Sequence, residues 1–87
     1  MNFVNYRIEF VKQAAKQFKK LSTQDRQRLK PKIDALAIDP RPSGVVKLSG
    51  DDLYRIRVGD YRIIYSIQDN RLLVLVVKIG HRRDVYR

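Results

Sequence analysis

Three arginines close together in the sequence have the chemistry to bind phosphate: Arg55, Arg57 and Arg62, in the stretch LYRIRVGDYRIIY at residues 53–65. Each guanidinium offers a planar fork of donors that matches the oxygens of a phosphate group. Gly59-Asp60 separates two runs of alternating apolar and polar residues, which predicts a β-hairpin closed by a type II′ turn. A two-residue loop fixes the register, so all three arginines share one face of the sheet.

The predicted register sets Arg57 opposite Arg62 and Arg55 opposite Ile64. Like charges directly opposite each other destabilise a sheet, and local conflicts of this kind tend to mark functional sites. A solvated outer face of a half-buried sheet accounts for the arginines about equally well. The other face carries Tyr54, Ile56, Val58, Tyr61, Ile63 and Tyr65, and we expect it to form core.

The segment GHRRDVYR, residues 80–87, adds further candidate groups. His81 has an ordinary pKa near neutrality, and Arg82 and Arg83 can hold phosphate. Tyr86 can stack on a base or transfer a proton. RNA cleavage without a metal needs the ribose 2′-OH to attack its own phosphate, while cations stabilise the charge on the phosphoryl oxygens and a base and an acid move protons. Taken singly, each residue has a simpler explanation: a histidine ending a strand, solvated arginines and a tyrosine packed on the core. Their combination with the hairpin arginines favours RNA chemistry.

Composition narrows the class of protein. The 87 residues carry a net charge of +10 and no cysteine, which predicts one domain over 1–87, a basic surface that binds polyanions, and no disulfides. The N-terminus does not resemble a signal peptide, and the longest apolar run, Leu72–Val77, is too short to cross a bilayer. We therefore expect a cytoplasmic protein without a membrane partner. No Walker loop, GxGxxG or HExxH motif occurs, and the aspartates fall mainly at predicted caps and turns, so we expect no metal and no cofactor.

The periodicity predicts an α+β fold in the order β-α-α-β-β-β. The expected elements are a strand at 4–10, a helix at 11–21 with its lysines outward, a second helix from Ser22, a short extended piece at 45–48, the hairpin, a turn at 69–70 and a central strand at 71–79. Ser22 with Asp25 resembles a capping box. Pro31 lies inside the second helix, where we expect a kink or break. The expected sheet is small, mainly antiparallel and four-stranded, with two helices on one face and the first strand beside the last.

Three segments together, KLSG, LYRIRVGDYRIIY and GHRRDVY, resemble the RelE family within the RelE/ParE superfamily of bacterial type II toxin–antitoxin toxins. The resemblance covers essentially the whole chain and includes the order of elements. It implies a small endoribonuclease, an mRNA interferase that cleaves mRNA in the ribosomal A site by 2′-OH attack without a metal. It also implies a cognate antitoxin that wraps the basic surface in a hetero-oligomer.

The resemblance also implies roles for single residues. Arg55 and Arg57 match the two basic positions before the hairpin turn, and Arg62 matches the arginine expected to stabilise the transition-state phosphate. Arg82 and Tyr86 match the arginine and tyrosine of the C-terminal motif. The best-known members have lysines at the positions of Arg55 and Arg57; because arginine stays protonated, a lysine base does not transfer. His81 is then an alternative base or acid, and Arg83 adds to phosphate binding.

Two other functions fit the same residues. One is a ParE-like toxin that poisons DNA gyrase by binding and cuts no RNA, and the other is an RNA-binding module, or a weakened toxin, whose arginines only grip the backbone. Retention of Arg82 and Tyr86 favours the nuclease. For the antitoxin, we expect an acidic amphipathic helix against the exposed stripe of the two helices or against the arginine face.

Overall fold

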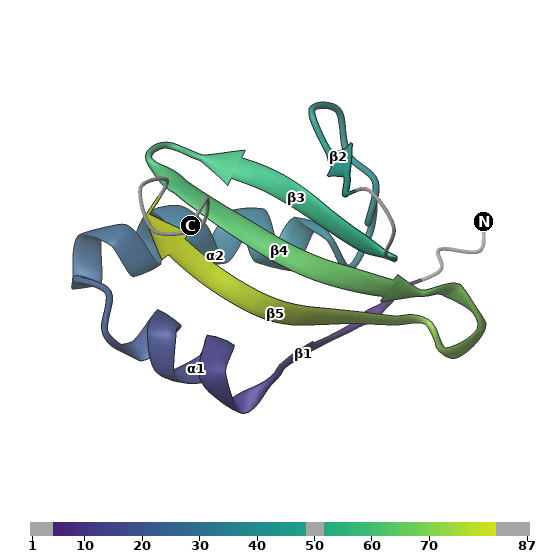
Figure 1. Ribbon diagram of the computed structural model, residues 1–87, viewed down its shortest axis with the longest axis horizontal. Coiled ribbons are helices and arrows are strands. Elements are labelled where there is room, and N and C mark those ends of the chain that lie inside the picture. The colour runs from purple at the N-terminus through teal and green to yellow at the C-terminus, as the bar shows by residue number, and fades with distance from the viewer. Residues whose placement is uncertain (1–4, 49–51, 82–87) are drawn as a thin grey trace.

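The computed structural model describes residues 5–48 and 52–81. In chain order the elements are β1 (Arg7–Phe10), α1 (Lys12–Lys19), α2 (Thr23–Ala35), β2 (Val46–Lys47), β3 (Leu53–Val58), β4 (Tyr61–Gln68), the 3-10 turn η1 (Asp69–Arg71) and β5 (Leu73–His81). Figure 1 shows the two helices packed behind a twisted sheet. The predicted α+β class and the predicted order of elements are confirmed.

The sheet is mixed, with strand order β1-β5-β4-β3-β2. β1 runs parallel to β5, and the other neighbours are antiparallel. The placement of the first strand beside a central last strand is therefore confirmed. The expected count of four strands was wrong, because the extended piece at 45–48 pairs with β3: Val46 lies opposite Arg55 and Lys47 opposite Tyr54. The Leu48 N–H also donates to the Leu53 carbonyl at 2.8 Å, which extends this short ladder.

The core lies between the helices and one face of the sheet. On the helix side it contains Ala14, Leu29, Ile33 and the C-cap residue Leu36, and on the sheet side it includes Ile56, Ile63, Tyr65, Val74, Val76 and Ile79. Tyr54, Val58 and Tyr61 are half-buried against it, so the predicted core face of the hairpin is confirmed. The lysines of α1 point outward and are exposed, as expected. The opposite face of the sheet is therefore the one that carries the arginines.

Helix α2 begins as the sequence predicts and continues where a break was expected. Ser22 is the N-cap, and its hydroxyl oxygen accepts a hydrogen bond from the Asp25 N–H at 3.1 Å. The expectation of a break at Pro31 was wrong, since the helix runs on to Ala35. Leu29 and Ile33, on either side of the proline, are almost fully buried against the sheet. This packing holds the helical path, while the exposed position of Pro31 leaves the carbonyl that lost its donor within reach of water.

Candidate nucleic-acid interface

The tight turn between β3 and β4 sets the geometry of the site. Gly59 has φ +60° and Asp60 does not adopt a positive φ, the combination a type II′ turn requires. A side chain at position 59 would also meet α2, because the Arg28 Nη2 atom lies 2.8 Å from where a Cβ would stand. The resulting register sets Arg57 opposite Arg62 and Arg55 opposite Ile64, as predicted. All three arginines thus lie on the outer face, away from the helices.

The three arginines differ in how far they are buried. Arg57 is exposed and Arg55 is half-buried, but only 6 % of Arg62 is accessible. The interpretation of these arginines as a uniformly solvated face therefore does not hold for Arg62. Keeping a guanidinium buried costs free energy unless its surroundings satisfy it. A buried guanidinium that is held in place and an exposed, mobile one directly across the ladder together offer donors to an anion that approaches from the outer face.

A β-bulge in β5 completes the outer face. Ile64 pairs with Lys78 but Tyr65 pairs with Val76, so Val77 is an extra residue in β5. Strict alternation from the buried Val76 would point position 78 towards the core. The bulge shifts the alternation by one residue, which puts Ile79 in the core opposite Ile63 and turns Lys78 to the outer face.

The outer face therefore has two cross-strand rows at the hairpin end of the sheet. The row nearer the turn is Arg57, Arg62 and Gly80, and the next row is Arg55, Ile64 and Lys78. The sequence had not suggested Lys78 as a site residue. A signal was present, since Lys78 is the only charged residue between Leu72 and Ile79. Its face could not be assigned, because most of the neighbouring positions are apolar in either phase.

His81 lies on the other side of the sheet from the arginines. It pairs with Tyr61, and the two rings meet edge to face with their centroids 5.6 Å apart. The Tyr61 hydroxyl donates to the Asp25 carboxylate at 2.8 Å, and this hydrogen bond raises the pKa of Tyr61. The structure thus brings His81 together with Tyr61 on the helix side rather than with Arg57 and Arg62. The other C-terminal candidates, Arg82, Arg83 and Tyr86, lie outside the described residues.

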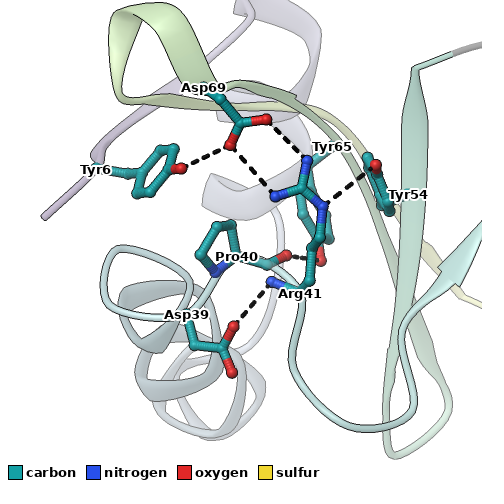
Figure 2. A network of polar contacts seen from close by, with 7 residues as sticks. All are labelled: Tyr6, Asp39, Pro40, Arg41, Tyr54, Tyr65 and Asp69. Carbon is teal, nitrogen blue, oxygen red and sulfur yellow. Dashed lines mark hydrogen bonds and ion pairs between the residues drawn. The ribbon is translucent and has the colours of Figure 1, made fainter. Parts of the chain in front are cut away.

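A second polar cluster lies at the opposite end of β4 and has a structural role. Figure 2 shows Arg41 between Asp69 and Tyr54. Arg41 donates to the two carboxylate oxygens of Asp69 at 3.2 and 2.9 Å, and the Tyr6 hydroxyl donates to the same carboxylate at 2.6 Å. The guanidinium also lies 5.4 Å from the centroid of the Tyr54 ring. The bond from Arg41, followed by the one from Tyr6, lowers the pKa of Asp69. This cluster ties the loop after α2 to the β4–β5 turn and leaves the arginine face untouched.

Within residues 5–48 and 52–81, no group of three or more histidine, aspartate or glutamate side chains is arranged to hold a metal ion. No helix in the part of the chain that the structure describes is long and apolar enough to span a membrane.

Comparison with known proteins identifies the family. The family model described as "ParE toxin of type II toxin-antitoxin system, parDE" matches residues 8–86. The chain belongs to the RelE/ParE toxin family. Among curated relatives, this toxin is 29 % identical over 85 residues to the mRNA interferase toxin RelE of Escherichia coli K12, which spans 93 % of this chain and 90 % of the relative.

Solved structures agree with this assignment. The toxin superposes on the isolated Escherichia coli RelE toxin with a TM-score of 0.79 and 32 % identity, covering 93 % of this chain and 90 % of the other. It superposes on an archaeal RelE–RelB complex from Pyrococcus horikoshii with a TM-score of 0.77 and 31 % identity, covering 92 % and 98 %. The family model has the ParE description whereas these relatives have RelE names, so membership by itself leaves both branches of the family as candidate functions.

Proposed function

We propose that this toxin is a RelE-type endoribonuclease that cleaves mRNA on the ribosome without a metal ion and thereby inhibits translation. The observation that carries the proposal is Arg57 directly opposite a 6 % exposed Arg62. An arrangement that sets like charges directly opposite each other lowers the stability of the sheet. Retaining it is reasonable where an anion binds between the two groups.

Arg57 and Arg62 can stabilise the negative charge that develops during RNA cleavage. The ribose 2′-oxygen attacks the adjacent phosphorus, the bond to the 5′-oxygen breaks, and the products are a 2′,3′-cyclic phosphate and a 5′-hydroxyl. Negative charge grows on the phosphoryl oxygens as the new bond forms, and donors fixed before the reaction stabilise that charge without reorganising. The buried Arg62 is the fixed donor and the exposed Arg57 a mobile one, while Arg55 on the same strand adds positive charge.

Proton transfer is assigned to other groups, since a guanidinium stays protonated and cannot take the proton of the 2′-hydroxyl. We assign the removal of the 2′-hydroxyl proton to the Tyr86 hydroxyl, in line with the family motif, and the leaving 5′-oxygen takes its proton from solvent. A direct role for His81 is less favoured, because its ring packs on Tyr61 on the helix side. Its contribution would be to fix the end of β5, from which the C-terminal motif follows.

The partners proposed are a cognate antitoxin, the ribosome and mRNA. Two related structures are RelE–RelB complexes from Escherichia coli and Pyrococcus horikoshii, which supports an antitoxin complex for this chain. A net charge of +10 suits an acidic antitoxin in one state and RNA in the other. Since both partners compete for positive surface, antitoxin binding would block RNA binding.

The second candidate function is gyrase inhibition without RNA cleavage, which the ParE description of the matching family model favours. A gyrase inhibitor needs a protein-binding surface and does not need two guanidiniums paired across a ladder to hold a phosphate. The arrangement of Arg57 and Arg62 therefore favours the nuclease.

The test is translation in a cell-free bacterial system, with mRNA 5′ ends mapped for the wild type, Arg62→Ala and Arg62→Lys. Cuts inside translated codons that need ribosomes and disappear in Arg62→Ala are the expected result, with Arg62→Lys strongly reduced because lysine lacks the fork. Thermal melts of both variants establish that they fold, which matters because Arg62 is buried. Intact mRNA together with loss of gyrase supercoiling would select the ParE-like function instead.

A further inference from the structure

The outer face carries more positive charge than one phosphate needs. Arg57 and Arg62 form the row nearer the turn, and the second row has Arg55 and Lys78 on either side of Ile64. Lys78 is half-buried, as are Arg55 and Ile64. The second row reaches from β3 across β4 to β5 only because the bulge at Val77 turns Lys78 outward.

We propose that Arg55 and Lys78 form a second phosphate subsite, which holds the phosphate next to the scissile one on a single RNA strand. This inference rests on the proposed nuclease function and adds a residue, Lys78, that the family motif does not include. The strand would cross the sheet from one row to the other, with Ile64 as the apolar floor between the two cations of the second row.

The spacing of the rows supports this assignment. Consecutive outward positions of a strand lie about 6.6 Å apart, and a stretched single strand of RNA separates successive phosphates by a similar length. Neighbouring strands lie about 4.8 Å apart, so Arg55 and Lys78 are about 10 Å apart at their backbones. Long side chains can close on one phosphate from both sides over that distance, and Arg62 is diagonal to both and within reach of either row.

The side chains of the two rows also support this assignment of the two phosphates. Gly80 stands opposite Arg62 and has no side chain, so β5 contributes only its backbone to the first row. In the second row β5 instead supplies the long side chain of Lys78, and the half-buried Ile64 offers an apolar surface for a ribose or base edge. The first row thus suits a reacting phosphate with its ribose, and the second row suits a phosphate that is only held.

The experiment is a double-mutant cycle in which one change is made in the protein and the other in the RNA. Ribosome-programmed mRNAs carry one neutral methylphosphonate linkage, either immediately 5′ or immediately 3′ of the mapped cleavage site. For each mRNA, kcat/KM is measured with the wild type, Lys78→Met and Lys78→Arg. The matched control is Lys47→Met, which removes the same charge from exposed β2, where the register with Tyr54 places it on the other face.

We expect Lys78→Met to lower kcat/KM about fivefold, as for loss of one charge-assisted contact at a half-exposed position. With one of the two methylphosphonate mRNAs, kcat/KM of the wild type should fall by a similar factor. The same mRNA should lower kcat/KM of Lys78→Met little further. Lys78→Arg and Lys47→Met should both stay near the wild type. Additive losses at both linkages, or wild-type activity in Lys78→Met, would overturn the subsite while leaving the nuclease intact. Absence of cleavage by the wild type would overturn the proposed function and the subsite with it.

Discussion

Replacing Arg57 with glutamine should stabilise the fold and weaken the activity in the same variant. The two arginines face each other across the β3–β4 ladder, and one of them is almost fully buried. Two unit charges about 5–8 Å apart in water repel by about 0.5–0.8 kcal/mol. Burial of Arg62 lowers the local dielectric constant and moves the repulsion towards about 1 kcal/mol, the upper end for a cross-strand pair.

The assay is thermal and urea unfolding at low and high salt, in parallel with the cell-free cleavage assay. A gain of about 0.5–1 kcal/mol corresponds to a rise in Tm of roughly 2–8 °C for a domain of this size. The gain should shrink as salt is raised to 1 M, where the Debye length is only about 3 Å, and part of it should persist because Arg62 is buried. Cleavage should fall at least tenfold, since a donor to the phosphate is lost.

The matched control is Arg55→Gln, which removes the same charge from the same strand but opposite the uncharged Ile64. It should give no gain in stability. A loss of stability in Arg57→Gln, or full activity in the stabilised variant, would refute the idea that this charge conflict is kept for function.

Three further predictions concern the fold that carries the site. Gly59→Ala should cost about 1–2 kcal/mol in urea unfolding, because φ is +60° there. The Arg28 guanidinium that the added methyl group would meet ends an exposed side chain and can move aside, so it adds little. An unchanged midpoint would contradict the turn geometry. Tyr65→Phe should cost about 1 kcal/mol, because its buried hydroxyl donates to a backbone carbonyl of the loop after α2 at 2.8 Å; a calorimetric Tm equal to the wild type would argue against that bond. Arg41 holds the pKa of Asp69 below its ordinary value, so the ionised form stabilises the folded state at neutral pH and this contribution is lost as the pH falls below the usual carboxyl range. Asp69→Asn should therefore flatten the acid side of a plot of Tm against pH, and an unchanged slope would contradict the assignment.

The hairpin could be predicted in detail because local rules determine it. A two-residue loop fixes the register, and alternation along β3 and β4 has one clearly apolar phase. The pairing of Arg57 with Arg62 followed from these two facts. The N-cap at Ser22 is local in the same way, since the capping hydroxyl and the N–H it accepts from are three residues apart.

The rest depended on contacts that the sequence does not display. β5 is apolar in both phases, so nothing in its pattern reveals the bulge at Val77 that turns Lys78 towards the arginines and His81 away from them. Burial of Arg62 is likewise a property of the assembled face. The helix continues through Pro31 because packing of Leu29 and Ile33 outweighs the lost backbone donor.

The most direct test of the account is a single-atom change in the RNA. An mRNA with one 2′-deoxynucleotide immediately 5′ of the mapped scissile phosphate is presented on the ribosome, beside the all-ribose mRNA, and the ends of the fragments are analysed. Attack by the 2′-hydroxyl on a phosphate held by Arg57 and Arg62 predicts 2′,3′-cyclic phosphate ends on the ribose mRNA and no cut at the deoxy position. Cleavage that persists at the deoxy position would contradict attack by the 2′-hydroxyl.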